Sequence, residues 1–170
     1  MKATAFIKKY LPYAKQMEEQ YFIPAVAILA QAGLESGWGE KSIGNNVFGV
    51  KYRKGDWGKQ LATTTEYYDN KKDFDRKENI ITHSYIPSLN KFKVVLRGVE
   101  FADYETPFDA FLQHSKLLLT ERYHPCLLYR DDPAKYLGCI GSKGYATDPN
   151  YKDKMAEMVY SVQKRIIKLK

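Results

Sequence analysis

The chain has 170 residues, of which 44% are hydrophobic and 28% are charged, and its formal net charge is +7. These values are typical of one soluble globular domain with a sizeable core, and no apolar run approaches membrane-spanning length. A basic surface favours polyanionic partners, but no helix-turn-helix, zinc or RNA-binding signature is present, so nucleic acid is not an expected partner.

Residues 4–20 form the first predicted helix. Thr4 is a suitable N-cap, and apolar residues recur at helical spacing after it. Pro12 falls inside this pattern. Because proline removes a backbone donor and clashes with the preceding turn, we expect it to kink or split the helix.

The second predicted helix runs from about Pro24 to Glu35. Pro24 suits the first helical turn, and the residues that follow are small or apolar on every side, which indicates a buried helix. Gly37 and Gly39 are good helix terminators. Glu35 is therefore predicted in the last turn.

This position has a chemical consequence for Glu35. The negative end of the helix dipole disfavours a carboxylate, and burial against Leu34 and Trp38 would disfavour ionisation further. Both effects raise the pKa, as a general acid that works near neutral pH requires. The alternative is a solvated glutamate at a helix end, but the apolar approach and the flanking tryptophan and glycines favour a functional role.

Helical periodicity disappears between Val47 and about Val95. Four short β-prone stretches, separated by Gly, Asp and Asn, predict a small irregular β lobe with two or three short antiparallel strands: Val47–Tyr52, Ala62–Tyr68, Ile80–Ile86 and Phe92–Leu96. A charge run within this region, Lys71–Lys77, is interpreted as a solvated loop.

The C-terminal third is predicted to be helical again. Three helix starts place a capping side chain directly before a proline, at Thr106-Pro107, Asp132-Pro133 and Asp148-Pro149. Gly141 is expected to end the second of these helices. The pattern as a whole predicts a mostly helical α+β domain.

Several motifs carry a family resemblance. The stretch Ala30–Gly39, AQAGLESGWG, followed by Asn45–Lys51, NNVFGVK, resembles the signature of glycoside hydrolase family 73. Thr63–Tyr67, TTTEY, is similar to the second acidic motif of that family, and Gly144–Tyr151, GYATDPNY, is similar to its C-terminal motif. The motifs occur in the family's order over most of the chain.

The resemblance implies a lysozyme-like helical domain, one unit over residues 1–170, with a small β lobe over the active-site cleft. It also implies an endo-β-N-acetylglucosaminidase that cleaves peptidoglycan, as flagellar muralytic domains and autolysins do. The sequence departs from the family between Asn70 and Gly98, where roughly twenty residues are inserted within the β lobe 47–98. This insertion is expected to alter the rim of the cleft.

The resemblance also implies roles for individual residues. Glu35 corresponds to the acid, Glu66 to the second carboxylate and Tyr145 to a tyrosine that orients the substrate's acetamido group or a charged intermediate. Expected substrate contacts are Trp38, Asn46, Phe48 and Tyr67. Without the resemblance, Glu66 would be interpreted as an exposed strand residue, and its role as nucleophile, base or helper of an acetamide-assisted reaction is left open.

Two rival functions remain at this stage. A muramidase or lytic transglycosylase can share a lysozyme-like fold with a Glu-Ser pair at a helix end, and a transglycosylase can work with one acid/base glutamate. A non-catalytic wall-binding module would keep the fold and tolerate the loss of Glu35. The carboxylates at both motif positions argue against that module.

The expected partner is peptidoglycan, bound by a monomer without cofactor, metal or membrane insertion. His83, His114 and His124 have no metal-ligand spacing. The N-terminus has no signal-peptide pattern, so either another export route or prior removal of a signal is needed for action at the wall, in the periplasm or outside the cell. A bridge between Cys126 and Cys139 is conceivable, but two buried thiols are the preferred interpretation.

Overall fold

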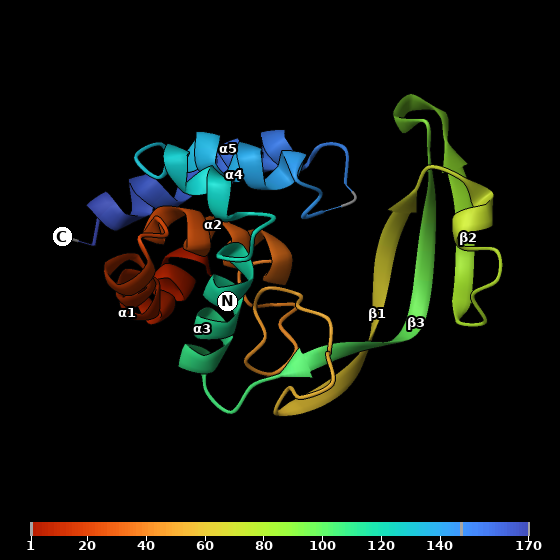
Figure 1. Cartoon of the computed structure of the whole chain (residues 1–170), viewed down its shortest axis with the longest axis horizontal. Coiled ribbons are helices and arrows are strands. Elements are labelled where there is room, and N and C mark those ends of the chain that lie inside the picture. The colour runs from red at the N-terminus through yellow and green to blue at the C-terminus, as the bar shows by residue number, and fades with distance from the viewer. Residues whose placement is uncertain (1, 147, 170) are drawn as a thin grey trace.

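The computed structural model describes residues 2–146 and 148–169. In this part of the chain, helices gather on one side and a three-stranded antiparallel sheet stands on the other (Figure 1). The elements are α1 Ala3–Tyr21, α2 Ala25–Ser36, β1 Gly58–Tyr68, β2 Ile80–Ile86, β3 Lys91–Asp103, α3 Pro107–Leu118, α4 Pro133–Ser142 and α5 Tyr151–Ile167, with short 3₁₀ turns between some of them. The predicted mostly helical α+β domain with a small β lobe is confirmed.

Helix α1 is continuous through Pro12, so the expected kink or split is wrong. Thr4 does not cap it either, because the N-cap position is Lys2. An interior proline costs roughly 3 kcal/mol. Burial of Phe6, Ile7 and Met17 contributes about 1.5–3 kcal/mol each and outweighs that cost. Tyr10 and Ala14 are buried on the same helix.

Helix α2 is the buried element around which the other helices pack, as predicted. Nine of its 12 residues are buried. Pro24 occupies the N-cap rather than the first turn, and Gly37 closes the C-terminus with a left-handed φ of 56°. A side chain at Gly33 would meet the Trp38 ring at 2.7 Å and Met158 at 2.8 Å, so this glycine permits the close approach of α5.

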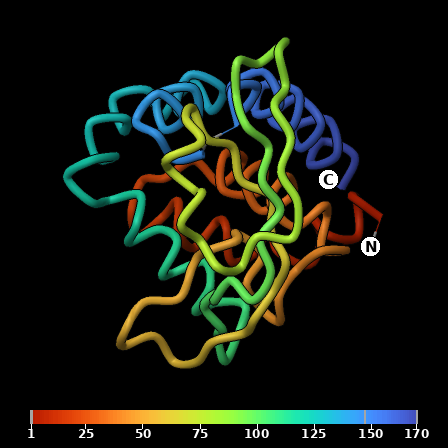
Figure 2. The backbone as a smooth tube through the Cα atoms, turned by 90° about the vertical axis from the view of Figure 1, so that its right-hand side faces the viewer, coloured from red at the N-terminus to blue at the C-terminus, as the bar shows by residue number. Residues whose placement is uncertain are grey.

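The sheet has the strand order β1-β3-β2, which puts β1 on one edge and β2 on the other. In Figure 1, β1 is the strand nearest the helices. Figure 2 shows the tube of β2 and β3 crossing in front of the helical layer. The antiparallel register sets Glu66 opposite Val94 and Tyr68 opposite Phe92, with a bulge between Ala62 and Thr64.

The predicted strand Val47–Tyr52 does not form. The structure has only an isolated bridge between Lys51 and Phe101 there. The Asn46 side chain accepts hydrogen bonds from the backbone N–H groups of Phe48 and Val50 at 3.2 Å, which ladder bonds would otherwise use. Gly49, with a φ of 61°, breaks the extended conformation as well.

The stretch interpreted as an insertion builds the outer part of the sheet. It contains β2 and the first half of β3, and it has a small core of its own, made by Phe74, Val94 and Leu96. The charge run is mostly exposed as predicted, but Phe74 within it is buried and anchors the run to the sheet.

The helix starts of the C-terminal third are confirmed at two of three places. Thr106 forms a capping box with Asp109 at the start of α3, and Asp132 accepts the N–H of Lys135 in α4. Helix α4 ends at Ser142, one residue beyond the expected stop. Asp148 does not cap α5, because its carboxylate accepts the N–H of Asn150 in a turn that delays the helix to Tyr151.

Cys126 and Cys139 form a disulfide, so the interpretation as two buried thiols is wrong. The bond ties the 3₁₀ segment His124–Tyr129 to α4 across a Cα–Cα distance of 5.6 Å. The spacing of the two cysteines in the sequence does not show that this 3₁₀ segment folds back onto α4, which brings the two sulfurs together.

None of the helices among the described residues is long and apolar enough to cross a bilayer. Over 2–146 and 148–169, no group of three or more His, Cys, Asp or Glu side chains has a metal-binding arrangement.

Candidate active site

Glu35 lies in the last turn of α2 with a half-buried side chain. Gly49 passes over its carboxyl group, since a β-carbon at Gly49 would lie 3.8 Å from Glu35 Oε2. Burial, followed by the negative charges of Asp148 and Glu66, raises the pKa of Glu35 from 4.5 to about 7. The side chain is therefore protonated in a large fraction of molecules at neutral pH, as a proton donor requires.

Glu66 projects from β1, the edge strand nearest the helices, and its side chain is 16% exposed. Lys51 Nζ forms an ion pair with Glu66 Oε1 at 2.8 Å. The charge of Glu66 is felt at Glu35, so the fold brings together two carboxyl groups from different lobes. The two carboxyl groups predicted from the motifs are therefore close enough to interact electrostatically, and their catalytic roles stay predictions.

Tyr145 lies in the segment between α4 and α5 and is half-buried. Its ring packs against His114 at 6.0 Å, Tyr123 at 6.1 Å and Tyr151 at 5.7 Å between centroids. Burial raises its pKa far above the ordinary value, and the charge of Glu35 adds to the effect. Tyr145 is therefore close enough to Glu35 for the two groups to interact electrostatically. Thr147 of the same motif lies outside the described residues.

Two of the predicted substrate contacts, Asn46 and Phe48, are buried and have structural roles near Glu35. Asn46 is buried, donates to the backbone oxygens of Val50 and Ala102, and thereby fixes the loop that carries Gly49. Phe48 is buried against the ring of His114. Direct substrate contact by Asn46 or Phe48 stays a prediction, and burial in this structure does not favour it.

The other two predicted contacts, Trp38 and Tyr67, come from the helical part of the fold and from the sheet. The Trp38 ring packs against Phe6 at 5.7 Å and under Arg165, in the helical core. Tyr67 of β1 is half-buried. Trp38 therefore has a packing role. Substrate binding by Trp38 or Tyr67 stays a prediction.

Sequence reasoning missed Gln31, His114 and Tyr151, which form a buried polar chain behind Glu35. It also interpreted Asp148 only as a cap, although its charge contributes to the pKa of Glu35. A signal was present for Gln31, because a polar residue one helical turn before the acid in an otherwise apolar helix needs a buried partner.

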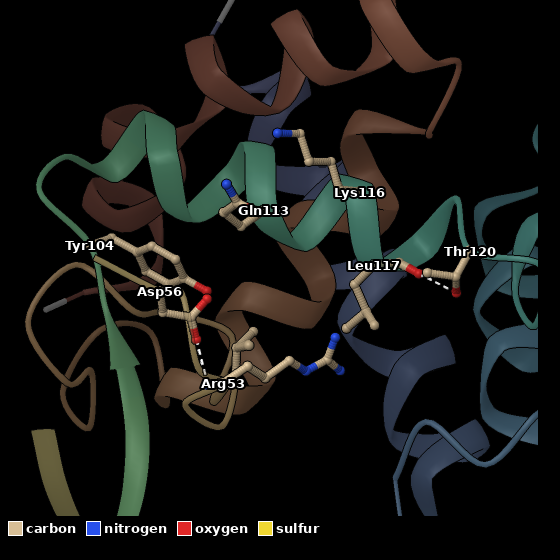
Figure 3. A pocket seen from close by; sticks show the side chains of 8 residues that line it. Arg53, Asp56, Tyr104, Gln113, Lys116, Leu117 and Thr120 are labelled. Carbon is tan, nitrogen blue, oxygen red and sulfur yellow. Dashed lines mark hydrogen bonds between the residues drawn. The ribbon is translucent and has the colours of Figure 1, made fainter. Parts of the chain in front are cut away.

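An open pocket of about 200 Å³ lies between α3 and the loop after Gly49 (Figure 3). Arg53, Asp56, Tyr104 and Lys116 are among the residues around it, and Glu35 is not. This hollow is therefore separate from the two carboxyl groups.

A glutamate with a raised pKa and a second carboxylate that acts on it electrostatically are the pair of groups that glycoside hydrolases use to cleave sugar bonds. The sequence comparison agrees: residues 11–164 match the glucosaminidase family, described as mannosyl-glycoprotein endo-beta-N-acetylglucosaminidase. This chain belongs to that family.

Individual relatives give the same picture. The peptidoglycan hydrolase FlgJ of Vibrio parahaemolyticus is 28% identical over 166 residues, which cover 94% of this chain and 47% of that protein. The glycoside hydrolase domain of Salmonella typhimurium FlgJ superimposes with a TM-score of 0.68 at 26% identity, covering 99% of this chain and 93% of that one.

A third match supports the fold alone. A peptidoglycan hydrolase mutant from Sphingomonas sp. A1 has a TM-score of 0.71 at 24% identity and covers 96% of this chain and 98% of its own. The present chain spans about half the length, or less, of the curated relatives it matches.

Proposed function

We propose that this chain hydrolyses the β-1,4 glycosidic bond that follows N-acetylglucosamine in bacterial peptidoglycan. The observation that carries the proposal is Glu35, whose pKa of about 7 arises from burial and from the negative charges of Asp148 and Glu66. Family membership and relatives named peptidoglycan hydrolases support the same substrate.

The reaction needs a proton donor and a group that stabilises positive charge at the anomeric carbon. Glu35 protonates the oxygen of the leaving sugar. Glu66 supplies the negative charge that opposes the cation-like transition state, and Lys51 holds the Glu66 carboxylate in place. Tyr145, within electrostatic reach of Glu35, orients the acetamido group or the charged intermediate.

The cellular location of the protein is inferred from two features outside the active site, the disulfide and the net charge. Disulfides persist in oxidising compartments and are rare in the cytosol, so the Cys126–Cys139 bond supports a periplasmic or extracellular location. A net charge of +7 favours encounter with anionic wall polymers. The chain acts as one catalytic domain and as a monomer.

One observation favours a second candidate function. The ion pair with Lys51 partly neutralises Glu66. A lytic transglycosylase or muramidase that relies mainly on Glu35 would tolerate that pairing better than an enzyme that needs the full charge of Glu66. A wall-binding module without catalysis is the third candidate, and the raised pKa of Glu35 argues against it.

The bond that is cut distinguishes these candidates. Purified peptidoglycan is digested, the products are reduced with borohydride, and the terminal sugars are identified by mass spectrometry. Reduced N-acetylglucosamine is the expected product. Reduced N-acetylmuramic acid would indicate a muramidase, an anhydro-muramic end a transglycosylase, and wall binding without new ends a binding module.

A further inference from the structure

Three polar side chains from three helices form a continuous chain through the core behind Glu35. His114 Nε2 of α3 lies 3.0 Å from Gln31 Oε1 of α2, and Gln31 Nε2 donates to the Tyr151 hydroxyl of α5 at 2.9 Å. All three residues are buried. Burial of polar groups is costly unless they are paired, so these hydrogen bonds fix one another's geometry.

The hydrogen bonds have a defined direction. Because Gln31 donates its amide N–H to Tyr151, its oxygen faces His114, and His114 Nε2 must carry the proton. Burial lowers the pKa of His114 to about 3, so the ring is neutral and Nδ1 is a bare acceptor. If the direction of these hydrogen bonds were reversed, His114 would bury an Nδ1–H without an acceptor among the described residues. Buried donors without a partner are rarer than buried acceptors without one.

This direction leaves the proton of Tyr151 free to point away from Gln31. Gln31 lies four residues before Glu35 on α2, so the two side chains share a helix face. The charge of Glu35 is felt at Tyr151. Phe48, next to Gly49, stacks on the His114 ring at 3.9 Å, so the loop over Glu35 rests on the same chain of groups.

We propose that Gln31 and His114 are positioning residues that hold the Tyr151 hydroxyl with its proton directed toward the Glu35 carboxyl group. This inference rests on the proposed role of Glu35 as the acid. The hydroxyl dipole stabilises the carboxylate that remains after Glu35 has given up its proton. It therefore limits how far burial raises the pKa of that group.

The other groups around Glu35 act in the opposite direction or are paired. Asp148 and Glu66 raise the pKa of Glu35, and each has a lysine partner. The titratable groups that interact with Glu35 are Asp148, which precedes α5, Glu66 of β1, Tyr145 and Tyr151. The lysine partners of the two carboxylates are Lys154 of α5 and Lys51 of the loop after α2. In this set, the Tyr151 hydroxyl is neutral and is held by the hydrogen bond that it accepts from Gln31 Nε2.

The test is a titration of Glu35 itself, which does not depend on activity. Glutamate labelled with ¹³C at the side-chain carboxyl reports ionisation by NMR between pH 4 and 9, and Glu35→Gln assigns the resonance. We expect Tyr151→Phe to raise the pKa of Glu35 by roughly 0.5 to 1, because the Glu35 carboxylate loses a stabilising hydroxyl dipole. Gln31→Met should raise it in the wild-type background and add nothing in the Tyr151→Phe background.

Tyr136→Phe is the matched control. The Tyr136 hydroxyl is also buried, and it has no hydrogen-bond partner among the described residues. Its removal should leave the titration of Glu35 unchanged. An unchanged pKa in Tyr151→Phe, or an equal shift in Tyr136→Phe, would overturn the proposal. Tyr151→Phe retains the ring, so it decides the question even if Gln31→Met fails to fold.

Activity provides a second readout in the same variants. The alkaline limb of kcat/KM against pH should move upward in Tyr151→Phe and Gln31→Met, because Glu35 stays protonated to higher pH. A merely structural role would lower the melting temperature without moving this limb. A wild-type protein that titrates as expected but cuts no glycan would contradict the proposed function and leave the positioning role supported.

Discussion

Lys51 Nζ lies 2.8 Å from Glu66 Oε1, and this pair joins the loop that passes over Glu35 to the edge strand of the sheet. The lysine side chain is 57% exposed and therefore well screened by solvent. Its charge nevertheless offsets part of the field that Glu66 exerts on Glu35.

Lys51→Gln should raise the pKa of Glu35, because Glu66 then acts on it without a counter-charge. We expect the alkaline limb of the pH–activity profile to move upward by about half a pH unit. The same substitution at Lys164, which lies in the last turn of α5, is a suitable control. A downward shift would show that Lys51 does not act through Glu66.

Glu66→Gln should be strongly impaired in wall lysis, because the cation-like transition state loses its opposing charge. The remaining activity should have its alkaline limb at lower pH, since removal of a negative charge lowers the pKa of Glu35. Near-normal activity would favour the transglycosylase alternative. Turbidity assays from pH 5 to 9 measure both effects.

Tyr145→Phe should lose less activity than Glu35→Gln, because a hydroxyl that orients the substrate contributes less than the proton donor. The ring contacts with Tyr151 and His114 are retained, so the melting temperature should change little. If the variant is fully active, Tyr145 only packs, and the catalytic groups reduce to the two carboxyl groups.

The Cys126–Cys139 bond closes a short loop with a sequence separation of 13. In the chain-entropy account, a loop of this size stabilises the fold by about 3 kcal/mol. The double variant Cys126→Ser/Cys139→Ser should therefore melt several degrees lower than the oxidised protein. Equal melting temperatures, together with two thiols that react with a thiol reagent before reduction, would contradict the bond.

Local signals predicted much of the fold. The apolar run before Glu35 predicted a buried helix and its end, and Thr106 and Asp132 predicted two helix starts, because caps and periodicity act within a few residues. The predicted helix start at Asp148 was wrong for the same reason, because a side chain that can cap a helix can also accept a hydrogen bond within a turn.

Interactions between distant residues were not predictable from the sequence. Gln31 is 83 residues from His114 and 120 from Tyr151, so no local pattern joins them. The family motifs predicted roles for Glu35, Glu66 and Tyr145, but they did not predict which neighbours set the pKa of Glu35. The continuity of α1 through Pro12 likewise depends on tertiary packing that a proline rule does not include.

The central claim is that Glu35 is the proton donor, and Glu35→Gln tests it most directly. Its pKa is 4.5 ordinarily and about 7 in the folded protein. The folded state thus holds a proton that the unfolded chain releases between these values, and stability falls as pH rises through that window. At pH 8 ionisation of the half-buried Glu35 carboxyl group lowers the free energy of unfolding by about 1–3 kcal/mol. A glutamine at this position does not ionise and avoids this loss.

The measurement is wall lysis, with mass spectrometry of reduced sugar ends, for wild type and Glu35→Gln at pH 6, beside thermal unfolding of both at pH 8. Loss of a proton donor removes roughly 10²–10⁴-fold of rate. We predict a loss of that size, the disappearance of reduced N-acetylglucosamine ends, and a melting temperature equal to or above that of wild type. Lysis within a few-fold of wild type by the folded variant would contradict the account.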